Sequence, residues 1–461
     1  MIPADTRSGA SVDVGQVLDT GPWSMVQKMA VVLAALSIVL DGFDSQLIGF
    51  AIPVMIKEWG VTRGEFAPAL AAGLFGMGLG SVLAGYFADR FGRRMALIGS
   101  VFLLGFATCA IGASQNVPMI AVLRFIAGLG IGGCLPSAST VAAEFTPIRR
   151  RTMAVTATIV CIPLGGMLAG VFANYVLPVL GWRALFFIGG SLPLTLGVLL
   201  LLTIPESPRF LVRHPERWDE LRRLLGRMHR PTTADTVFTD LGEQKVESRA
   251  GFAAVFQQGR ARDTLALSGA FFLCLLAVYS AFSWLPTMLT AEGLDMTVAG
   301  AGLTAYNLGG VFGALACAIL ITRYGSRGPL ALCCAGGAAS AFFLTQVNVS
   351  NTNVLIFGLL VHGLCVNAVQ STMYAVCAYA YPTNVRATGT ATALGFGRLG
   401  AILSSFAGAA VITAGGASGY LTMLGLAMLG ALAALMVVRR HIPPLAQQNT
   451  ISSPVKVAMG N

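Results

Sequence analysis

Residues 88–94, ADRFGRR, have a counterpart 233 positions later, where residues 321–327 are ITRYGSR. Two more matches flank this one. AIPVMIKEWG at 51–60 matches WLPTMLTAEG at 284–293 with the same offset, and EFTPIRRR at 144–151 matches YAYPTNVR at 379–386 with an offset of 235. Matches in the same order and at nearly constant spacing indicate two copies of one half. In membrane proteins such repeats are typical of transporters that bind substrate between the halves, near the bilayer midplane.

The composition indicates a membrane protein. Hydrophobic residues make up 55% of the 461 residues, charged residues only 11%, and the mean hydropathy is +0.75. Soluble domains average about 25% charged residues. Apolar windows of about 20 residues, the length that crosses a bilayer, recur about twelve times. The predicted spans are 29–52, 66–88, 95–114, 118–143, 152–177, 183–204, 264–290, 297–321, 329–347, 353–380, 388–414 and 418–438.

The spans divide six and six around a charged segment. The sequence predicts an all-α membrane protein, with twelve transmembrane helices in two pseudo-symmetric six-helix bundles. The expected parts are an N-terminal tail (1–28), a first bundle (29–204), a central loop (205–262), a second bundle (263–438) and a C-terminal tail (439–461). We expect the protein to function as a monomer.

The chain has a net charge of +10, and the distribution of its positive residues indicates how the protein is oriented in the membrane. Arginines cluster in alternate loops, at 90–94, 149–151 and 323–327 and after the last span, whereas loops such as GASQNV and TAGGASG contain no Lys or Arg. The positive-inside rule therefore places both termini and the central loop in the cytoplasm. This predicts a multi-pass protein of the bacterial inner membrane and removes the reason to expect a nucleic-acid partner.

Two carboxylates and an arginine lie inside predicted spans of the first half. Asp41 and Asp44 belong to an apolar helix, where each ionised carboxylate costs roughly 2.5–3.5 kcal/mol. Counting along the helices puts Asp41 about 18 Å deep, Asp44 about 22 Å deep and Arg124 about 9 Å from the opposite side. Asp44 and Arg124 therefore reach nearly the same level of the ~30 Å core. Either they form a pair that only holds helices together, or Asp41 and Asp44 bind and release protons, the coupling ion.

Arg398 is the predicted anion-binding residue of the second half. Its repeat counterpart is Pro163, so the repeat does not require an arginine here. It lies about 15 Å deep, near the midplane, and a guanidinium grips carboxylates in two-point geometry. The predicted substrate site contains Arg398, Arg124, Tyr306, Asn307, Asn367, Gln370 and Tyr374. Ordinary helix packing is the competing interpretation for each aromatic and amide residue, and for the lone His362.

Other chemistry finds little support in the sequence. All nine cysteines fall in apolar spans without paired spacing, which indicates neither disulfides nor a metal site. No nucleophile–base arrangement suggests an enzyme, and no Walker motif suggests ATP. We expect no cofactor besides the proton. The expected partners are a small organic anion, protons and the lipid bilayer.

The loop GYFADRFGRR (85–94) has the G-x-x-x-D-R-x-G-R-R pattern of the major facilitator superfamily. PESPRFL (205–211) resembles the sugar-porter-like branches of that superfamily. DGFD in the first span, GFGRLGAI (395–402), YPTNVRATG (381–389) and the tail SVDVGQVLDTGPWS resemble the aromatic acid:H⁺ symporter family over nearly the whole chain. The resemblance implies that the D-G-x-D pair moves protons and that the substrate is an aromatic acid.

The same resemblance implies a cytoplasmic gate, in which charges bridge helices and hold the outward-facing state. The predicted gate residues are Gly85, Asp89, Arg90, Gly92, Arg93, Arg94, Glu144, Arg151, Glu206, Arg209 and Arg386. The second half departs from the pattern, because Ala318, Thr322 and Tyr379 stand where Gly85, Asp89 and Glu144 stand in the first. We therefore expect the first half to supply the acids. Solvated loop charges that only fix topology are the alternative.

The sequence thus predicts a proton-coupled importer of a small aromatic carboxylate of benzoate, hydroxybenzoate, chloroaromatic or phenoxyacetate type, working by alternating access. One alternative is uptake of another organic anion, such as a muconolactone. Proton-driven efflux of amphipathic compounds and a sugar-type porter share the fold. A receptor built on a transporter fold is the alternative from another class, although the central loop and short tails leave little room for a signalling domain.

Overall fold

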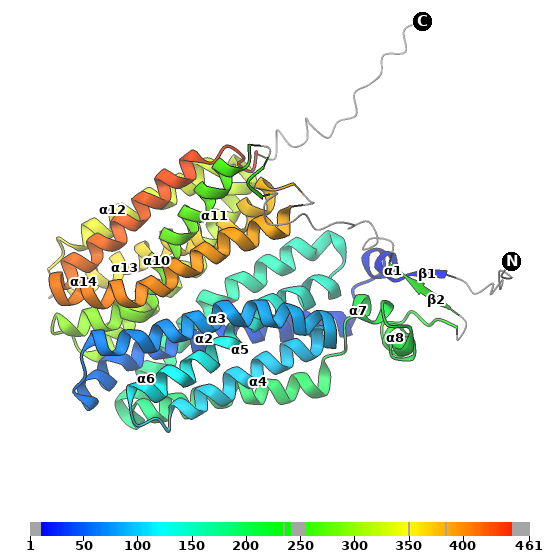
Figure 1. Ribbon diagram of the computed structural model, residues 1–461, viewed down its shortest axis with the longest axis horizontal. Helices are drawn as coiled ribbons and strands as arrows, with labels where there is room; N and C mark the ends of the chain where they lie inside the picture. The colour runs from blue at the N-terminus through cyan, green and yellow to red at the C-terminus, as the bar shows by residue number, and fades with distance from the viewer. Residues whose placement is uncertain are drawn as a thin grey trace, which may run out of the picture. The chain divides into compact units, whose positions relative to one another are not determined.

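The computed structural model describes residues 11–233, 236–240, 255–257, 259–348, 351–382 and 385–444. Its long helices follow one another along the chain (Figure 1). The first half contains α2 (Met25–Trp59), α3 (Arg63–Phe91), α4 (Arg93–Ile111), α5 (Val117–Phe145) and α6 (Ile148–Thr203). The second contains α10 (Ala261–Ala291), α11 (Met296–Tyr324), α12 (Arg327–Leu344), α13 (Thr352–Ala380) and α14 (Arg386–Val437).

Ten helices of the described chain are long and apolar enough to cross a membrane. Two of them, α6 and α14, each contain two successive membrane spans separated by a break in the helix. The backbone of α6 leaves the helical region at Gly181, and that of α14 leaves it at Gly416, both with positive φ. Each break falls in the gap expected between two spans, at 178–182 and 415–417. The twelve-helix prediction is therefore confirmed, with the first helix beginning at Met25 rather than at residue 29.

The described residues form two compact units. The first unit contains the described residues within 1–47, 72–166 and 176–248. The second unit contains the described residues within 48–71, 167–175 and 249–444. In the first, α4 packs along α5. In the second, α10 packs along α14 and α11 along α13, while α12 contacts both α13 and α14. The units thus follow the two halves of the repeat, except that residues 48–71 and 167–175 group with the second half.

The predicted N-terminal tail folds onto the predicted central loop. Strand β1 (Ser11–Asp13) pairs in parallel with β2 (Val237–Thr239), and α1 (Val14–Thr20) follows. The loop supplies α7 (Pro208–Val212), the 3₁₀ turn Pro215–Arg217 and α8 (Trp218–Arg227). Leu18 of α1 is buried in one apolar cluster with Leu221, Leu225 and Phe238. A small folded layer therefore stands where the sequence predicts a tail and a loop.

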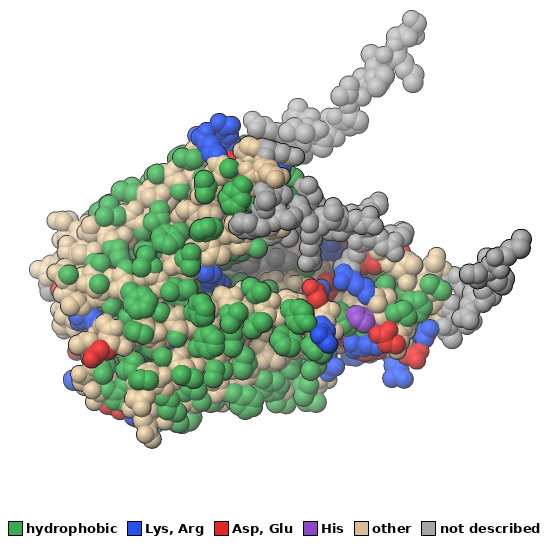
Figure 2. Space-filling model, viewed as in Figure 1, with side chains coloured by type: hydrophobic (Ala, Val, Ile, Leu, Met, Phe, Trp, Pro, Cys, Tyr) green, Lys and Arg blue, Asp and Glu red, His purple; other side chains and the backbone are tan. Residues whose placement is uncertain are grey.

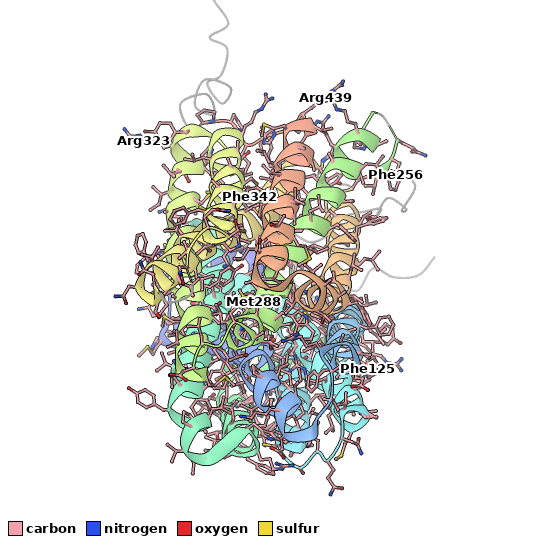
Figure 3. The ribbon with its side chains drawn as sticks, turned by 90° about the vertical axis from the view of Figure 1, so that its left-hand side faces the viewer. Phe125, Phe256, Met288, Arg323, Phe342 and Arg439 are labelled. Atoms are coloured by element: carbon pink, nitrogen blue, oxygen red, sulfur yellow. The ribbon has the colours of Figure 1, made fainter. Side chains whose placement is uncertain are left out.

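Residues 439–444 are the described part of the predicted C-terminal tail, and they turn back onto the second unit. Ser326 N donates to the Ile442 carbonyl oxygen at 2.9 Å, and Arg439 N donates to the Asp263 carboxylate at 2.9 Å. Arg323 and Arg439 lie at the same end of this unit (Figure 3). The rest of the predicted tail, 445–461, lies outside the described residues.

Apolar side chains cover the flanks of the helices, and charged side chains gather around α7 and α8 (Figure 2). Val179 and Leu202 are 79% and 78% exposed, and Ile319 is 70% exposed. A soluble protein rarely exposes so much contiguous apolar surface. The surface is therefore that of a multi-pass membrane protein.

Candidate functional site

Three helices of the first unit meet at Asp44. Its Oδ2 lies 3.8 Å from Nη1 of Arg124 on α5, and the Thr108 hydroxyl of α4 donates to its Oδ1 at 2.5 Å. The Asp44 and Arg124 side chains are 1% and 7% exposed. The structure thus brings together the two charges that helix counting puts at one level. Thr108 is a partner that sequence reasoning missed, because threonines in spans usually bond to their own helix.

Asp41 lies one turn before Asp44 on α2 and is also buried, with 5% of the residue exposed. Gly42, between the two acids, allows α2 to approach α6 closely. A Cβ at Gly42 would lie 2.2 Å from the Ile162 carbonyl oxygen, which no side chain tolerates. The sequence D-G-F-D therefore combines two buried carboxylates with a tight helix contact.

Arg398 of α14 faces an aromatic surface of the second unit. Its Nη1 donates to the Tyr279 hydroxyl of α10 at 2.9 Å, and its guanidinium carbon lies 5.9 Å from the centre of the Tyr279 ring. Phe282 packs edge-on against Tyr279, with ring centres 5.7 Å apart, and against Tyr306 at 6.0 Å. A half-buried cation thus lies at one end of a row of rings, an arrangement suited to a planar anion.

The predicted polar residues of this site differ in their burial and in their hydrogen bonds. Asn307 and Asn367 are buried, and each amide nitrogen donates to the carbonyl four residues back, Leu303 and Gly363, at 3.0 Å. Gln370 is half-buried on the same helix as Asn367. One N–H of each amide is therefore used within its own helix, and the side chains are buried rather than open to a solute.

Two further residues of the second unit have packing partners. Tyr374 packs edge-on against Phe271, with ring centres 5.5 Å apart. His362 is buried, and its Nδ1 lies 3.0 Å from both the Ser340 hydroxyl and the Gly337 carbonyl oxygen. These contacts agree with the packing interpretation of His362.

The gate motif forms a network within the first unit. Arg93 pairs with Asp89 at 2.7 Å and lies 3.6 Å from Glu144. Glu206 accepts hydrogen bonds from the backbone N–H groups of Arg94, at 3.0 Å, and Ser207, at 2.9 Å. The Ser207 hydroxyl donates to Glu144. Carboxylates from α5 and from the segment before α7 thus bind the loop that joins α3 to α4.

Gly92 is required at the centre of this loop. Its φ is 102°, and a Cβ there would lie 2.1 Å from Oε2 of Glu206. The backbone conformation therefore disfavours any side chain here, and an added Cβ would also displace the Glu206 carboxylate from its present position. Gly85, by contrast, has open space around it.

The structure adds two acids that the sequence did not single out. Asp19 of α1 lies 2.7 Å from Arg151 and 3.7 Å from Arg209, and it accepts the Ile148 N–H at 3.1 Å. Asp240, after β2, lies 3.3 Å from Arg209. Arg151 of α6 thus binds the folded layer formed by tail and loop, and Arg209 of α7 forms its ion pairs within that layer.

The remaining predicted gate residues lie apart from this network. Arg90 is exposed and donates to the Tyr86 hydroxyl at 3.0 Å. Arg386 belongs to the second unit, is exposed, and donates to the Tyr381 carbonyl oxygen at 3.4 Å. Within the described part of the chain, no cluster of three His, Cys, Asp or Glu side chains is placed to hold a metal ion.

Two six-helix halves with buried charges inside the spans define a secondary-transporter fold. The Major Facilitator Superfamily profile matches residues 34–345 and 267–458, and the chain belongs to this superfamily. It is accordingly a transporter and not an enzyme.

Named relatives and a solved structure agree with this assignment. The chain is 35% identical to the 4-hydroxybenzoate transporter PcaK of Pseudomonas putida, over 90% of this chain and 93% of the relative. It is 32% identical to a gallate transporter of Pseudomonas putida, over 93% and 95%. The Escherichia coli xylose transporter XylE, in a partially occluded inward open conformation, superposes with a TM-score of 0.71 at 19% identity, covering 90% of this chain and 99% of XylE.

Proposed function

We propose that this protein imports a small aromatic carboxylate together with protons across the bacterial inner membrane, by alternating access. The observation that carries the proposal is the Arg398–Tyr279 pair, a guanidinium within a span that is bonded to a phenol and lies beside a row of aromatic rings. Such a site offers a two-point grip for a carboxylate and an apolar wall for its ring. The two relatives above are named as transporters of 4-hydroxybenzoate and of gallate, and these names support an aromatic carboxylate as the substrate.

The buried Asp44–Arg124 pair provides the coupling. Protonation of Asp44 or Asp41 from outside weakens the hold of the carboxylate on Arg124, and the substrate anion then binds Arg398. A cavity with unbalanced charge is costly to close within the membrane, whereas a fully loaded cavity is not. Neither the proton alone nor the anion alone therefore permits closure, which is the condition for symport.

The distribution of arginines supports one orientation in the membrane. The arginine-rich loops at 90–94 and 149–151 lie at the ends of spans, and the positive-inside rule assigns such loops to the cytoplasm. This orientation places the Asp89–Arg93–Glu144 network and the α1–α7–α8 layer at the cytoplasmic face. We infer that this network closes and opens the inner gate.

The test is uptake of a panel of radiolabelled aromatic acids into cells expressing the wild type, Asp41→Asn or Arg398→Ala, with and without a protonophore. We expect one acid to accumulate in the wild type alone and the protonophore to abolish its accumulation. If Arg398→Ala accumulates the acid like the wild type, the anion-binding role is wrong. If no acid accumulates and cells instead lose a preloaded amphipathic compound, the protein is an exporter.

A further inference from the structure

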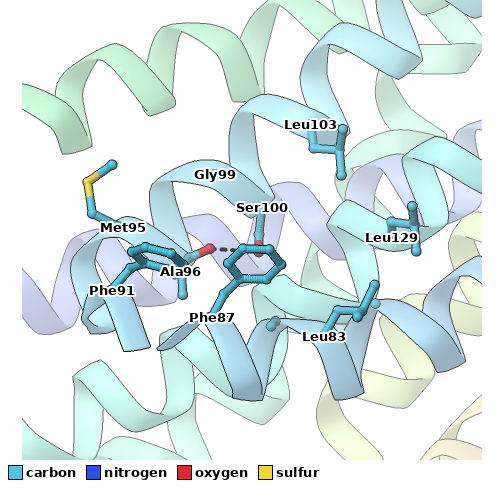
Figure 4. Close-up of a pocket in the computed structure, with 11 residues that line it drawn as sticks. Leu83, Phe87, Phe91, Met95, Ala96, Gly99, Ser100, Leu103 and Leu129 are labelled. Atoms are coloured by element: carbon cyan, nitrogen blue, oxygen red, sulfur yellow. Dashed lines mark hydrogen bonds between the residues drawn. The ribbon is translucent and has the colours of Figure 1, made fainter. Parts of the chain in front are cut away.

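An apolar groove of about 560 Å³ opens on the flank of the first unit. Phe87 and Phe91 of α3 and Met95 of α4 form its rim, and Leu83, Leu103 and Leu129 lie along it (Figure 4). The Ser100 hydroxyl in the wall donates to the Ala96 carbonyl oxygen at 2.8 Å, so the wall offers no polar group that needs a ligand. The groove is therefore suited to an elongated apolar ligand.

The rim of the groove is exposed at the surface of the unit. Phe87, Phe91 and Met95 are each about half exposed, at 48%, 50% and 50%. An α-helix about 10 Å across would fill a groove of this volume over only about one turn. A flexible acyl chain, by contrast, fits along its length. Since lipid tails are as apolar as the groove, the groove alone does not select one lipid over another.

Selection is supplied by Arg90, at the arginine-rich end of the groove. Its guanidinium carbon lies 5.6 Å from the centre of the Phe91 ring, which is part of the rim. It donates to the Tyr86 hydroxyl. Within the described chain Arg90 forms no ion pair, because Asp89 is paired with Arg93, and Glu206 accepts backbone N–H groups. One exposed cation thus lies beside an apolar groove.

We propose that this groove binds one anionic phospholipid of the leaflet that faces the arginine-rich end. One acyl chain lies along Leu83, Leu103 and Leu129, and the phosphate binds Arg90. Basic sites between transmembrane helices at the cytoplasmic side bind anionic headgroups in this way. The lipid contacts α3 and α4 on either side of Gly92, so it also braces the loop that contains the gate network.

The test uses the purified full-length chain in detergent and native mass spectrometry, with phosphatidylglycerol and phosphatidylcholine of identical acyl chains. We expect one bound phosphatidylglycerol per chain and weaker binding of phosphatidylcholine. Arg90→Gln is expected to weaken phosphatidylglycerol binding about fivefold, as for one arginine near an anionic surface. Gly99→Leu is expected to abolish it, because Gly99 lines the groove and its added side chain meets only open space.

Two matched variants serve as controls. Arg323 is the repeat counterpart of Arg90 and lies 5.5 Å from the centre of the neighbouring Tyr324 ring, so Arg323→Gln removes an equivalent cation elsewhere. Gly78 also has open space around it but does not line the groove, so Gly78→Leu adds the same side chain outside it. Both are expected to bind phosphatidylglycerol like the wild type.

Three results would overturn the proposal. Equal binding of the two lipids would remove the role of Arg90, and undiminished binding in Gly99→Leu would place the lipid outside the groove. A dimer that dissociates in Gly99→Leu would make a second copy the occupant. A thermal unfolding transition shows that each variant is folded. If Gly99→Leu does not fold, the comparison of phosphatidylglycerol binding between Arg90→Gln and Arg323→Gln decides whether the proposal holds. None of these measurements depends on a transported substrate, so they stand apart from the test of import.

Discussion

Arg124 and Asp44 form a buried ion pair whose closest atoms, Nη1 and Oδ2, are 3.8 Å apart, while the other Asp44 oxygen accepts a hydrogen bond from Thr108. The pair is thus in contact but beyond hydrogen-bonding distance. Burying two charges costs about as much as their attraction returns, so stability alone gives no reason to keep them. A proton on Asp44 would instead change the interactions of α2, α4 and α5 together, which is what a coupled transporter requires.

Replacing Thr108 tests whether this arrangement matters for transport. Thr108→Val keeps the shape of the side chain but removes the donor to Asp44, and a lost buried hydrogen bond costs about 1–3 kcal/mol. We expect the maximal rate of uptake to fall about tenfold or more, with Thr108→Ser close to the wild type. Thr195, exposed and bonded to Ser191 of its own helix, provides the control Thr195→Val. Wild-type uptake by Thr108→Val would show that the hydroxyl has no part in coupling.

Arg398 and Tyr279 are expected to act on substrate affinity. Arg398→Ala removes one partner of a charge-assisted contact, worth about 2–5 kcal/mol, and should raise KM about 30-fold or more. Arg398→Lys keeps the positive charge but not the planar guanidinium group, so its KM should lie between those of the wild type and Arg398→Ala. Tyr279→Phe should change KM only about two- to tenfold, the effect of one hydrogen bond.

The control for this series is Tyr175→Phe, because Tyr175 is 77% exposed and distant in sequence from both residues. Initial rates of uptake over a range of substrate concentrations separate KM from maximal rate. A fall in maximal rate at unchanged KM in Arg398→Ala would contradict an anion-binding role.

The contacts of Asp19 predict that the folded N-terminal segment stabilises the first unit. Asp19→Asn weakens its pairing with Arg151 and Arg209, whose side chains are largely buried, and should lower Tm by a few degrees, equivalent to about 1–2 kcal/mol. The segment before α2 should also become more sensitive to protease. Glu220→Gln breaks a local, half-exposed pair between Glu220 of α8 and Arg217 of the preceding 3₁₀ turn and should change Tm little. Equal Tm values for the two variants would show that the tail is only loosely attached.

Gly92 is expected to tolerate no side chain. Gly92→Ala forces a residue with a Cβ into positive φ and against Glu206, at a cost of about 1–3 kcal/mol, and should lower Tm and membrane abundance. Gly85→Ala adds the same methyl group to the same motif in open space and should leave Tm unchanged. If both variants unfold at the wild-type temperature, the loop is not held as the structure places it.

The sequence predicts most of the helical framework, because long apolar runs and glycine-containing gaps are local signals. Counting residues along α2 and α5 also puts Asp44 and Arg124 at one level, which is where the structure has them in contact. A one-dimensional depth estimate succeeds here because membrane helices cross a slab of fixed thickness.

Contacts that depend on side-chain direction or on folded polar segments could not be predicted in this way. Nothing in the sequence distinguishes Thr108 from Thr392, which bonds to its own helix at Thr388. Asp19 lies in a polar segment whose pairing with residues 237–239 is a long-range strand contact of only three residues. The apolar groove is lined by residues of α3, α4 and α5, so the positions of three helices must be known before it can be recognised.

Proton-coupled import is tested by measuring proton movement together with substrate uptake in proteoliposomes that contain the purified protein and a pH-sensitive dye. The labelled aromatic acid that accumulates in the cell panel is added outside, with or without an imposed inward proton gradient, and vesicles with Arg398→Ala correct for passive entry of the acid. We expect the gradient to accelerate uptake and the added substrate to acidify the lumen more with the wild type than with Arg398→Ala. Uptake that ignores the gradient, or acidification no greater than with Arg398→Ala, would contradict proton-coupled import.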